Sequence, residues 1–256
     1  MSDTDARRRF RVAALDANAE GVLDPGPDVL RHLRVLRATV GDEVYLFDGR
    51  GEEVRAAITR LDGDALRVRV IDRVLRDVES PLTTCLVQAV PARAARMETI
   101  VRQSTELGVG RVVPVFARRS QHSKASTASR RRLAQRWRRI ADSAAEQCGR
   151  TRVPDIDDPA PYAELDWTGL PRPLLLAHPS AGSKRSVDAR GLADGDRPDG
   201  VTLLVGPEGG WSDDEVEAAT AHGAVLLQLG PRVLRADSAG TVALAVLQYL
   251  WGDLDS

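Results

Sequence analysis

Cysteine, lysine and aromatic residues are scarce in this 256-residue chain. The two cysteines, Cys85 and Cys148, are too few for a disulfide framework, and the four histidines show no metal-ligand spacing with them. We therefore predict no structural zinc. Aromatic residues make up only 4% of the chain, so stacking on aromatic rings would contribute little to any binding of nucleic acid.

Long hydrophobic runs are also missing. The longest apolar segment, Val242–Trp251, is far too short to span a bilayer. Arginines at positions 7–9 are not followed by the apolar core of a signal peptide. These patterns predict a cytoplasmic protein.

The net charge of −1 excludes a uniformly basic surface, but the charges are unevenly distributed. One block is basic and contains no acid: Arg111, Arg118, Arg119, Lys124, Arg130, Arg131, Arg132, Arg136, Arg138 and Arg139. Such a block is typical of a phosphate-binding surface. It is equally typical of a solvated helix face in an arginine-rich chain.

Residues 7–74 have the pattern of a compact β-rich module. Val44–Phe47, Val54–Ile58 and Leu66–Val70 read as short strands separated by turns, and the last two alternate apolar and polar residues. Alternation places one face of each strand on a core and the other in water, as in a small antiparallel barrel.

A short helix predicted over residues 27–37 carries Arg31, Arg34 and Arg37 at a spacing of three, which places them on one face. Together with the arginines of the N-terminal arm, they form a second candidate basic patch: Arg7, Arg8, Arg9 and Arg11. We consider this patch the better candidate for a functional surface because a small barrel brackets it.

The pattern changes around residues 77–81, where we place a domain boundary between residues 1–76 and 77–256. Strands and helices alternate beyond it, which predicts an α/β domain with a mostly parallel sheet. The expected elements are strands at Thr84–Val90, Val112–Phe116 and Leu174–Ala177, and helices at Arg93–Leu107 and Arg130–Cys148.

The stretch Leu203–Leu250 completes this domain with two strand–loop–helix transitions in succession. An apolar run at Leu203–Val205 ends in the loop Gly206–Gly210, and a helix follows from Ser212. A second run ends at Leu229, followed by the loop Gly230–Arg235 and a closing helix from Ser238. Ligands bind to parallel sheets where such loops leave the strands. We therefore predict one small-molecule site between the two loops.

The glycine loop at 206–210 matches neither the dinucleotide fingerprint nor a phosphate-binding loop, because it lacks their glycine spacing and lysine. Asp213 and Asp214 follow it in the first turn of the next helix, where they disfavour a phosphate. An adenosine-type ligand without phosphates, held by backbone groups, fits this loop better.

Several short motifs occur together and in order. They are His32–Arg37 (HLRVLR), Val40–Val44 (VGDEV), Phe47–Gly49 (FDG), Thr105–Val109 (TELGV), Glu146–Arg150 (EQCGR), Val205–Gly210 (VGPEGG) and Leu229–Arg235 (LGPRVLR). In this combination, which covers nearly the whole chain, the sequence closely resembles the ribosomal RNA small-subunit methyltransferase E family of the SPOUT superfamily.

The resemblance implies a PUA-like RNA-binding barrel over residues 1–76 and a trefoil-knotted SPOUT methyltransferase domain over residues 77–256. It implies a homodimer that binds S-adenosylmethionine in the knot. The implied reaction is methylation of N3 of a uridine in the decoding region of 16S ribosomal RNA, on the 30S subunit.

Site residues follow from the resemblance, position by position. The implied cofactor-binding residues are Leu176, His178, Pro179, Val205, Gly206, Glu208, Gly209, Gly210, Leu229, Gly230, Pro231, Val233 and Leu234. The implied residues near the reacting base are Arg119, Arg235 and Asp237, and the implied contacts to RNA phosphates are Arg9, Arg34 and Arg37.

The sequence departs from the family at three places. Ala236-Asp237-Ser238 stands where relatives usually have Thr-Glu-Thr, Arg118 where an acid is common, and Gln103 where a lysine is common. The acid before the last helix is shortened by one carbon, but its carboxylate is retained.

Uridine N3 carries a proton that must leave before or during methyl transfer, so a base or a stabilising cation is needed. Asp237 is our candidate for the base or for its orienting group, Arg235 for the cation, and Glu208 is a weaker candidate. Asp237 is about as well placed to cap the last helix. No metal is required for this reaction.

Two alternative functions are a ribose 2′-O-methyltransferase of the same superfamily and a non-catalytic RNA-binding factor with an inactive cofactor pocket. The sequence of the last loop, Gly230–Arg235, favours methylation of a base over methylation of a ribose. Intact glycine loops and the acid at Asp237 argue against the second.

Overall fold

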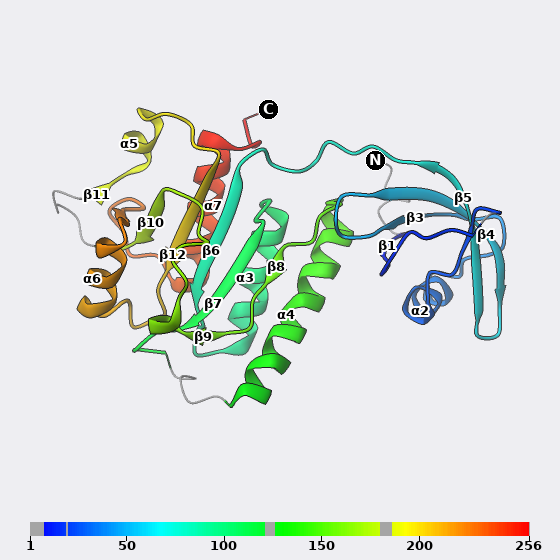
Figure 1. Ribbon diagram of the computed structural model, residues 1–256, viewed down its shortest axis with the longest axis horizontal. Helices are drawn as coiled ribbons and strands as arrows, with labels where there is room; N and C mark the ends of the chain where they lie inside the picture. The colour runs from blue at the N-terminus through cyan, green and yellow to red at the C-terminus, as the bar shows by residue number, and fades with distance from the viewer. Residues whose placement is uncertain (1–7, 19, 121–125, 180–185, 256) are drawn as a thin grey trace. The chain divides into compact units, whose positions relative to one another are not determined.

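The computed structural model describes residues 8–18, 20–120, 126–179 and 186–255 (Figure 1). The chain divides into two compact units. The first comprises Met1–Glu79 and Asp142–Val153, and the second comprises Ser80–Ala141 and Pro154–Ser256. The first unit thus includes a segment, residues 142–153, that the sequence analysis assigned to the second domain.

A five-stranded sheet with the order β1-β3-β4-β5-β2 forms the first unit, together with helix α2. The elements are β1 (Arg9–Arg11), β2 (Val22–Leu23), α2 (Pro27–Val35), β3 (Glu43–Phe47), β4 (Glu53–Asp62) and β5 (Ala65–Arg73). Strand β1 is parallel to β3, and the other neighbours are antiparallel. The predicted strands and helix are all present.

The core of this unit follows the alternation read from the sequence. Every second side chain of β4 is buried at Val54, Ala56 and Ile58, and β5 does the same at Leu66 and Val68. Leu30 and Leu33 of α2 pack into the same cluster. Because the buried face of α2 is apolar, its arginines remain on the surface.

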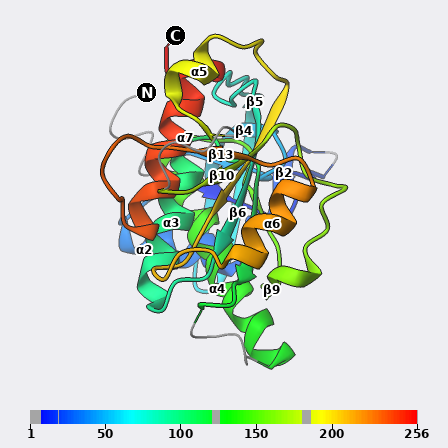
Figure 2. The same ribbon diagram turned by 90° about the vertical axis from the view of Figure 1, so that its left-hand side faces the viewer.

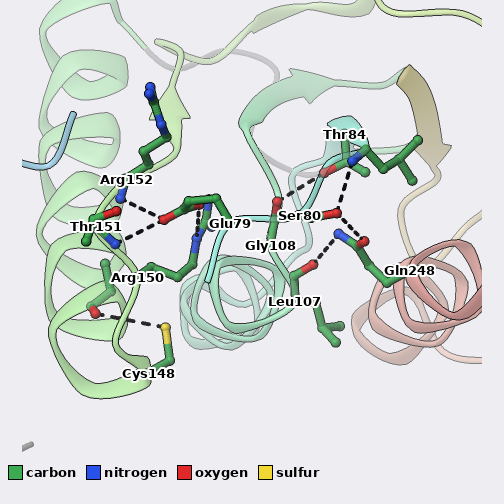
Figure 3. Close-up of polar contacts among 12 residues, drawn as sticks. Glu79, Ser80, Thr84, Leu107, Gly108, Cys148, Arg150, Thr151, Arg152 and Gln248 are labelled. Atoms are coloured by element: carbon green, nitrogen blue, oxygen red, sulfur yellow. Dashed lines mark hydrogen bonds and ion pairs between the residues drawn. The ribbon is translucent and has the colours of Figure 1, made fainter. Parts of the chain in front are cut away.

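Residues 142–153 are held in the first unit by polar contacts. Glu79 accepts hydrogen bonds from the backbone amides of Thr151 and Arg152, at 3.0 and 2.8 Å, and forms an ion pair with Arg150 at 2.8 Å (Figure 3). The Arg11 side chain pairs with Asp142 at 2.7 Å. A sequence pattern carries little trace of such contacts, because the partners are far apart along the chain.

The second unit is built on a sheet with the strand order β11-β13-β10-β12-β6-β7-β8, in which β9 also pairs with β7. The strands are β6 (Thr83–Ala89), β7 (Arg111–Phe116), β8 (Asp155–Ile156), β9 (Ala160–Pro161), β10 (Leu174–Ala177), β11 (Ser186–Val187), β12 (Gly200–Val205) and β13 (Val225–Leu227). Every pair in the described part of this sheet is parallel. The predicted α/β class is confirmed, and the threading of the chain through a knot stays a prediction.

Helices cover both faces of this sheet. They are α3 (Ala94–Glu106), α4 (Thr127–Cys148), α5 (Ala189–Ala193), α6 (Asp213–Ala221), α7 (Ala236–Trp251) and the 3-10 turn η1 (Tyr162–Glu164). Figure 2 shows α3 and α7 together on one face and α6 on the opposite face. The sheet is therefore buried on both sides, which explains why its strands read as continuous apolar runs.

Buried polar groups connect α3 to α7. Gln248, a fully buried residue of α7, donates a hydrogen bond to the carbonyl of Leu107 at 2.8 Å and accepts one from the Ser80 hydroxyl at 2.7 Å (Figure 3). Gly108 ends α3 with a φ of 77°, as a glycine stop predicts. A side chain at Gly108 would lie 2.9 Å from Nε2 of Gln248, so this glycine also permits the close approach.

Helix α6 begins with a capping box between Ser212 and Glu215, which satisfies backbone amides at its first turn. The helix α7 begins two residues earlier than predicted, at Ala236. Within the described residues, no helix has both the length and the apolar character needed to cross a membrane.

Candidate functional site

Three adjacent parallel strands, β10, β12 and β13, end at the same edge of the second sheet. The loops that leave them border a cavity of about 590 Å³. This volume lies within the range of about 300–1,000 Å³ that is typical of small-molecule sites. The structure therefore has a cavity at the carboxyl ends of the strands, where the sequence predicts the small-molecule site.

The structure brings most of the predicted cofactor residues together around this cavity. All of them line it except Leu176, which is buried within β10, and Pro231, which is exposed. The last loop contributes apolar lining at Leu229, Val233 and Leu234 and charged lining at Arg232 and Arg235. The role of the predicted residues in binding a cofactor stays a prediction.

Close packing requires glycine in the loop that follows β12. A Cβ at Gly206 would lie 3.2 Å from Nε1 of Trp211, and a Cβ at Gly209 would lie 3.1 Å from Cβ of Arg119. Gly210 has a φ of 70°, which side chains rarely tolerate. The loop therefore presents backbone groups to the cavity.

Arg119 supports the glycine loop from outside. Its Nη1 donates hydrogen bonds to the carbonyls of Gly209 and Trp211, at 2.8 and 3.2 Å. The side chain also lines the cavity. Arg119 thus fixes the loop, and its predicted place beside the reacting base stays a prediction.

Glu208 points from the glycine loop toward the start of α3. Its carboxylate accepts hydrogen bonds from the amide of Ala92, at 3.2 Å, and from Nη1 of Arg96, at 2.6 Å. Burial alone would raise the pKa of Glu208, but the hydrogen bonds from its own amide, from Ala92 and from Arg96 outweigh it, and the pKa is lowered. Glu208 is therefore held as a carboxylate, which weakens its case as the base.

Arg96 is a cavity residue that the sequence analysis missed. It lies in the first turn of α3, and its guanidinium contacts Glu208 and lies 3.6 Å from Oδ2 of Asp237. One signal could have found it. The strand before α3 is β6, which pairs with β12 in register up to Val205, so the start of α3 must lie at the same edge as the glycine loop.

Arg235 and Asp237 lie at the start of α7, and of the two only Arg235 is among the described residues that line the cavity. Arg235 is the N-cap residue of the helix, and its side chain lines the cavity. Asp237 lies inside the first turn and makes no side-chain capping bond, so the alternative role as helix cap is wrong. Its position still stabilises a carboxylate through the helix dipole.

The carboxylate of Asp237 is largely enclosed. Its side chain is 25% exposed, and Oδ1 is buried without a hydrogen-bond partner among the described residues. Buried polar atoms are rarely left unpaired in folded proteins. Oδ1 of Asp237 is thus an unsatisfied acceptor beneath the surface, next to Arg96, which lines the cavity.

Of the three arginines implied to contact RNA, Arg9 is placed elsewhere. Its side chain is fully buried, pairs with Glu53 at 2.9 Å and donates to the carbonyls of Ala145 and Arg150. The prediction that Arg9 contacts phosphates is wrong, because the guanidinium is committed inside the first unit.

Arg34 and Arg37 are exposed, as predicted from the helix face. Arg34 is 3.8 Å from Asp64, and Arg37 has a φ of 53° just beyond the end of α2. Of the other arm residues, Arg8 pairs with Asp42 at 3.2 Å, and Arg7 lies outside the described residues.

The basic block between positions 111 and 139 is partly neutralised by acids. Its ion pairs are Arg111–Asp157, Arg118–Asp214, Arg136–Glu98 and Arg138–Asp158, at 2.6–2.9 Å. Lys124 lies outside the described residues. These pairs favour the interpretation of the block as a solvated surface.

No group of acids, histidines and cysteines in the described ranges could hold a metal ion.

Comparison with known families matches both parts of the chain. Residues 25–71 match an RNA methyltransferase PUA domain, and residues 78–248 match an RNA methyltransferase domain. Among solved structures, a ribosomal RNA small subunit methyltransferase E from Neisseria gonorrhoeae, bound to S-adenosylmethionine, superposes with a TM-score of 0.84 at 31% identity, covering 96% of this chain and 99% of the other. A putative methyltransferase from Legionella pneumophila, also in complex with S-adenosylmethionine, has a TM-score of 0.83 at 32% identity, with 96% and 99% coverage.

Curated relatives agree with the structural comparison. The ribosomal RNA small subunit methyltransferase E of Synechocystis is 34% identical over 85% of this chain and 69% of its own length. The protein of the same name from Mycobacterium bovis is 32% identical over 94% of this chain and 90% of its own. With both domains matched in order and the predicted loops gathered around one cavity, the chain belongs to the ribosomal RNA small subunit methyltransferase E family.

Proposed function

We propose that this protein transfers a methyl group from S-adenosylmethionine to N3 of a uridine in the decoding region of 16S ribosomal RNA, within the 30S subunit in the cytoplasm. The observation that carries the proposal is the arrangement of two charged residues at the start of α7: Arg235 lines the cavity formed by the glycine loops, and Asp237 lies 3.6 Å from Arg96, which also lines it. A cation and a carboxylate there meet the needs of methylation at a protonated ring nitrogen.

The cavity suits S-adenosylmethionine in size and chemistry. Its volume of about 590 Å³ is adequate, its glycine loop offers backbone donors and acceptors, and Leu229 and Leu234 offer apolar contact to a nucleoside. The loop lacks the lysine that a triphosphate would need. When bound, S-adenosylmethionine supplies an electrophilic methyl group on a sulfonium.

The protein's own residues supply position and charge. Asp237 accepts the N3 proton of the uridine, or orients the base so that solvent accepts it, through its carboxylate, on a side chain that is 25% exposed. Arg235 stabilises the negative charge that develops on the uracil oxygens as the proton leaves. Both residues belong to the start of α7, so one rigid element fixes their separation.

The RNA and a second protomer contact other surfaces in this proposal. Arg34 and Arg37 contact phosphates of the ribosomal RNA from the first unit. The outer face of α7 exposes apolar side chains at Val242 and Tyr249, which are 41% and 61% exposed, and Leu254 just beyond the helix is 51% exposed. Such an apolar surface is typical of a protein interface and supports a homodimer.

Mapping of modified nucleotides in 16S ribosomal RNA tests the proposal. A strain without the gene should lack one 3-methyluridine, and the restored gene should return it. Purified protein with labelled S-adenosylmethionine should methylate 30S subunits from the deletion strain. An unchanged map would refute the proposal. Loss of a ribose 2′-O-methyl group instead would show that the protein methylates a ribose and not a base.

A further inference from the structure

Arg96 connects two carboxylates that come from different loops of the cavity. Its Nη1 lies 2.6 Å from Oε1 of Glu208, in the glycine loop, and its Nε lies 3.6 Å from Oδ2 of Asp237, at the start of α7. The Arg96 side chain is 29% exposed and lines the cavity. A single guanidinium thus bridges the segments that follow β12 and β13.

We propose that Arg96, which lines the cavity, is a positioning residue that holds the carboxylate of Asp237 in place at the start of α7 by anchoring it, through Glu208, to the glycine loop. This inference rests on the proposed role of Asp237 in methyl transfer. In this proposal Arg96 does not contact the reacting atoms. Arg96 fixes the position of the Asp237 carboxylate, which does.

The two distances show how the residue acts. The contact with Glu208 is a charge-assisted hydrogen bond, whereas the 3.6 Å separation from Asp237 is too long for one. Arg96 is therefore anchored at Glu208 and attracts Asp237 without occupying its oxygens. Because the 3.6 Å separation leaves Oδ2 of Asp237 without a hydrogen bond from Arg96, that oxygen keeps its capacity to accept one.

Charge balance supports the same role. Glu208 and Asp237 both approach Arg96, so without this cation two neighbouring carboxylates would lose the positive charge between them. Like charges in a partly buried site repel, and the more loosely held of the two would move away. We expect that residue to be Asp237, because Glu208 retains its hydrogen bonds from Ala92.

Arginine suits this position better than lysine. The planar guanidinium presents Nη1 and Nε to different partners, whereas an ammonium is a single point charge. Arg96→Lys should therefore keep the attraction to one carboxylate and lose the bridge. Partial recovery of activity by lysine, relative to glutamine, is expected.

A double-mutant cycle tests the coupling. We would measure single-turnover transfer of labelled methyl groups to 30S subunits at saturating S-adenosylmethionine for Arg96→Gln, Asp237→Asn and the double variant. Misplacement of a reacting group by about 1 Å can cost up to about 100-fold in rate. We expect Arg96→Gln to slow transfer by about 10- to 100-fold with little change in the KM for RNA, and to add nothing when Asp237 is already asparagine.

Arg102→Gln is the matched control, because Arg102 is an exposed arginine of the same helix that does not line the cavity. It should transfer methyl groups at the wild-type rate. If Arg96→Gln does not fold, Glu208→Gln removes the anchor and leaves Arg96 in place. Glu208→Gln should slow methyl transfer in the wild-type background and have no further effect in the Asp237→Asn background.

Multiplicative losses in the double variant would overturn the inference, since they would mean that Arg96 and Asp237 act independently. Failure of the proposed function is a separate result. Wild-type protein that methylates ribosomal RNA at an atom other than uridine N3 would refute that function, yet the cycle would still report whether Arg96 and Asp237 are coupled.

Discussion

Arg9 and Glu53 form an ion pair that is fully excluded from solvent, with Nε and Oε1 2.9 Å apart. The guanidinium of Arg9 also lies 3.9 Å from the centre of the Phe47 ring and donates to two carbonyls of residues 145 and 150. Burial lowers the pKa of Arg9, while the Glu53 carboxylate opposes that shift. Arg9 therefore helps Glu79 and Arg11 to hold the segment 142–153 in the first unit.

Replacement of Arg9 by methionine should destabilise the protein strongly. Glu53 would lose one ion-pair partner and keep its ion pair with Arg76, and the two carbonyls would lose their donor. Breaking a buried pair by removing one partner costs about 3–5 kcal/mol. Urea unfolding should show a loss of this size for Arg9→Met and a change within about 0.5 kcal/mol for the exposed Arg34→Gln. Equal stability of the two variants would contradict a structural role for Arg9.

The contrast between Arg9 and Arg34 shows where prediction from the sequence fails. Both are arginines in basic stretches near the N-terminus, and both were expected to contact RNA. Arg9 is buried because Ala145, 136 positions away, and Arg150 provide carbonyls for it. No local pattern encodes such partners. Arg34 was placed on the surface from helix periodicity alone, which is a local property.

The cavity itself was predictable, because it depends on local signals and one rule of topology. Short apolar strands predict a parallel sheet, and the loops at their carboxyl ends must then meet at one edge. The strand Leu174–Ala177 and the loops around Gly206 and Gly230 follow from this reasoning. The same rule places the start of the helix that carries Arg96 at this edge, but it does not reveal the contacts of Arg96 with Glu208 and Asp237, because these join segments more than 100 positions apart.

Exposed arginines of the first unit should control the salt dependence of RNA binding. Each phosphate contact that is removed lowers the log–log slope of affinity against salt by roughly 0.7–0.9. We expect Arg34→Gln and Arg37→Gln to reduce the slope additively in filter binding to 30S subunits. Arg60→Gln is the control, since Arg60 is also exposed but pairs with its neighbour Asp62 at 3.0 Å. A slope unchanged by the double substitution would exclude these residues from the RNA interface.

Gly206→Ala should weaken the binding of S-adenosylmethionine. The added methyl group would lie 3.2–3.3 Å from Trp211, which is 4% exposed and cannot easily move. The glycine loop would then shift into the cavity. Overpacking of this kind costs about 1–3 kcal/mol, which corresponds to about a 5- to 150-fold loss of affinity by titration calorimetry.

Gly195→Ala provides the matched control for that measurement. A Cβ at Gly195 would meet only the carbonyl oxygen of Leu192, at 3.7 Å, which is an ordinary contact. It should bind S-adenosylmethionine as the wild type does. Wild-type affinity in Gly206→Ala would show that the loop after β12 does not shape the cofactor site.

Glu146 should make the stability of the protein depend on pH. Its carboxylate accepts a hydrogen bond from the amide of Arg11 at 2.8 Å. Burial raises the pKa of Glu146 above its ordinary value of 4.5, and the nearby Asp142 adds to the shift, whereas the Arg11 amide, His32 and Arg9 oppose it. The folded protein therefore retains this proton at a pH where the unfolded chain has lost it.

The sign of the effect follows from proton linkage. Well below pH 4.5, Glu146 is protonated in both states and contributes no pH dependence. As the pH rises from there, Glu146 ionises in the unfolded chain before it ionises in the folded protein. Ionisation then stabilises the unfolded state more than the folded state, so the free energy of unfolding of the wild type falls until the pH exceeds the raised pKa of the folded state. Glutamine does not titrate, and its side-chain oxygen can still accept the hydrogen bond from Arg11. The unfolding free energy of Glu146→Gln relative to the wild type should thus increase between about pH 4 and neutrality and then level off, as urea titrations would measure. A difference that stays constant or decreases over this range would show that the folded protein does not hold the proton.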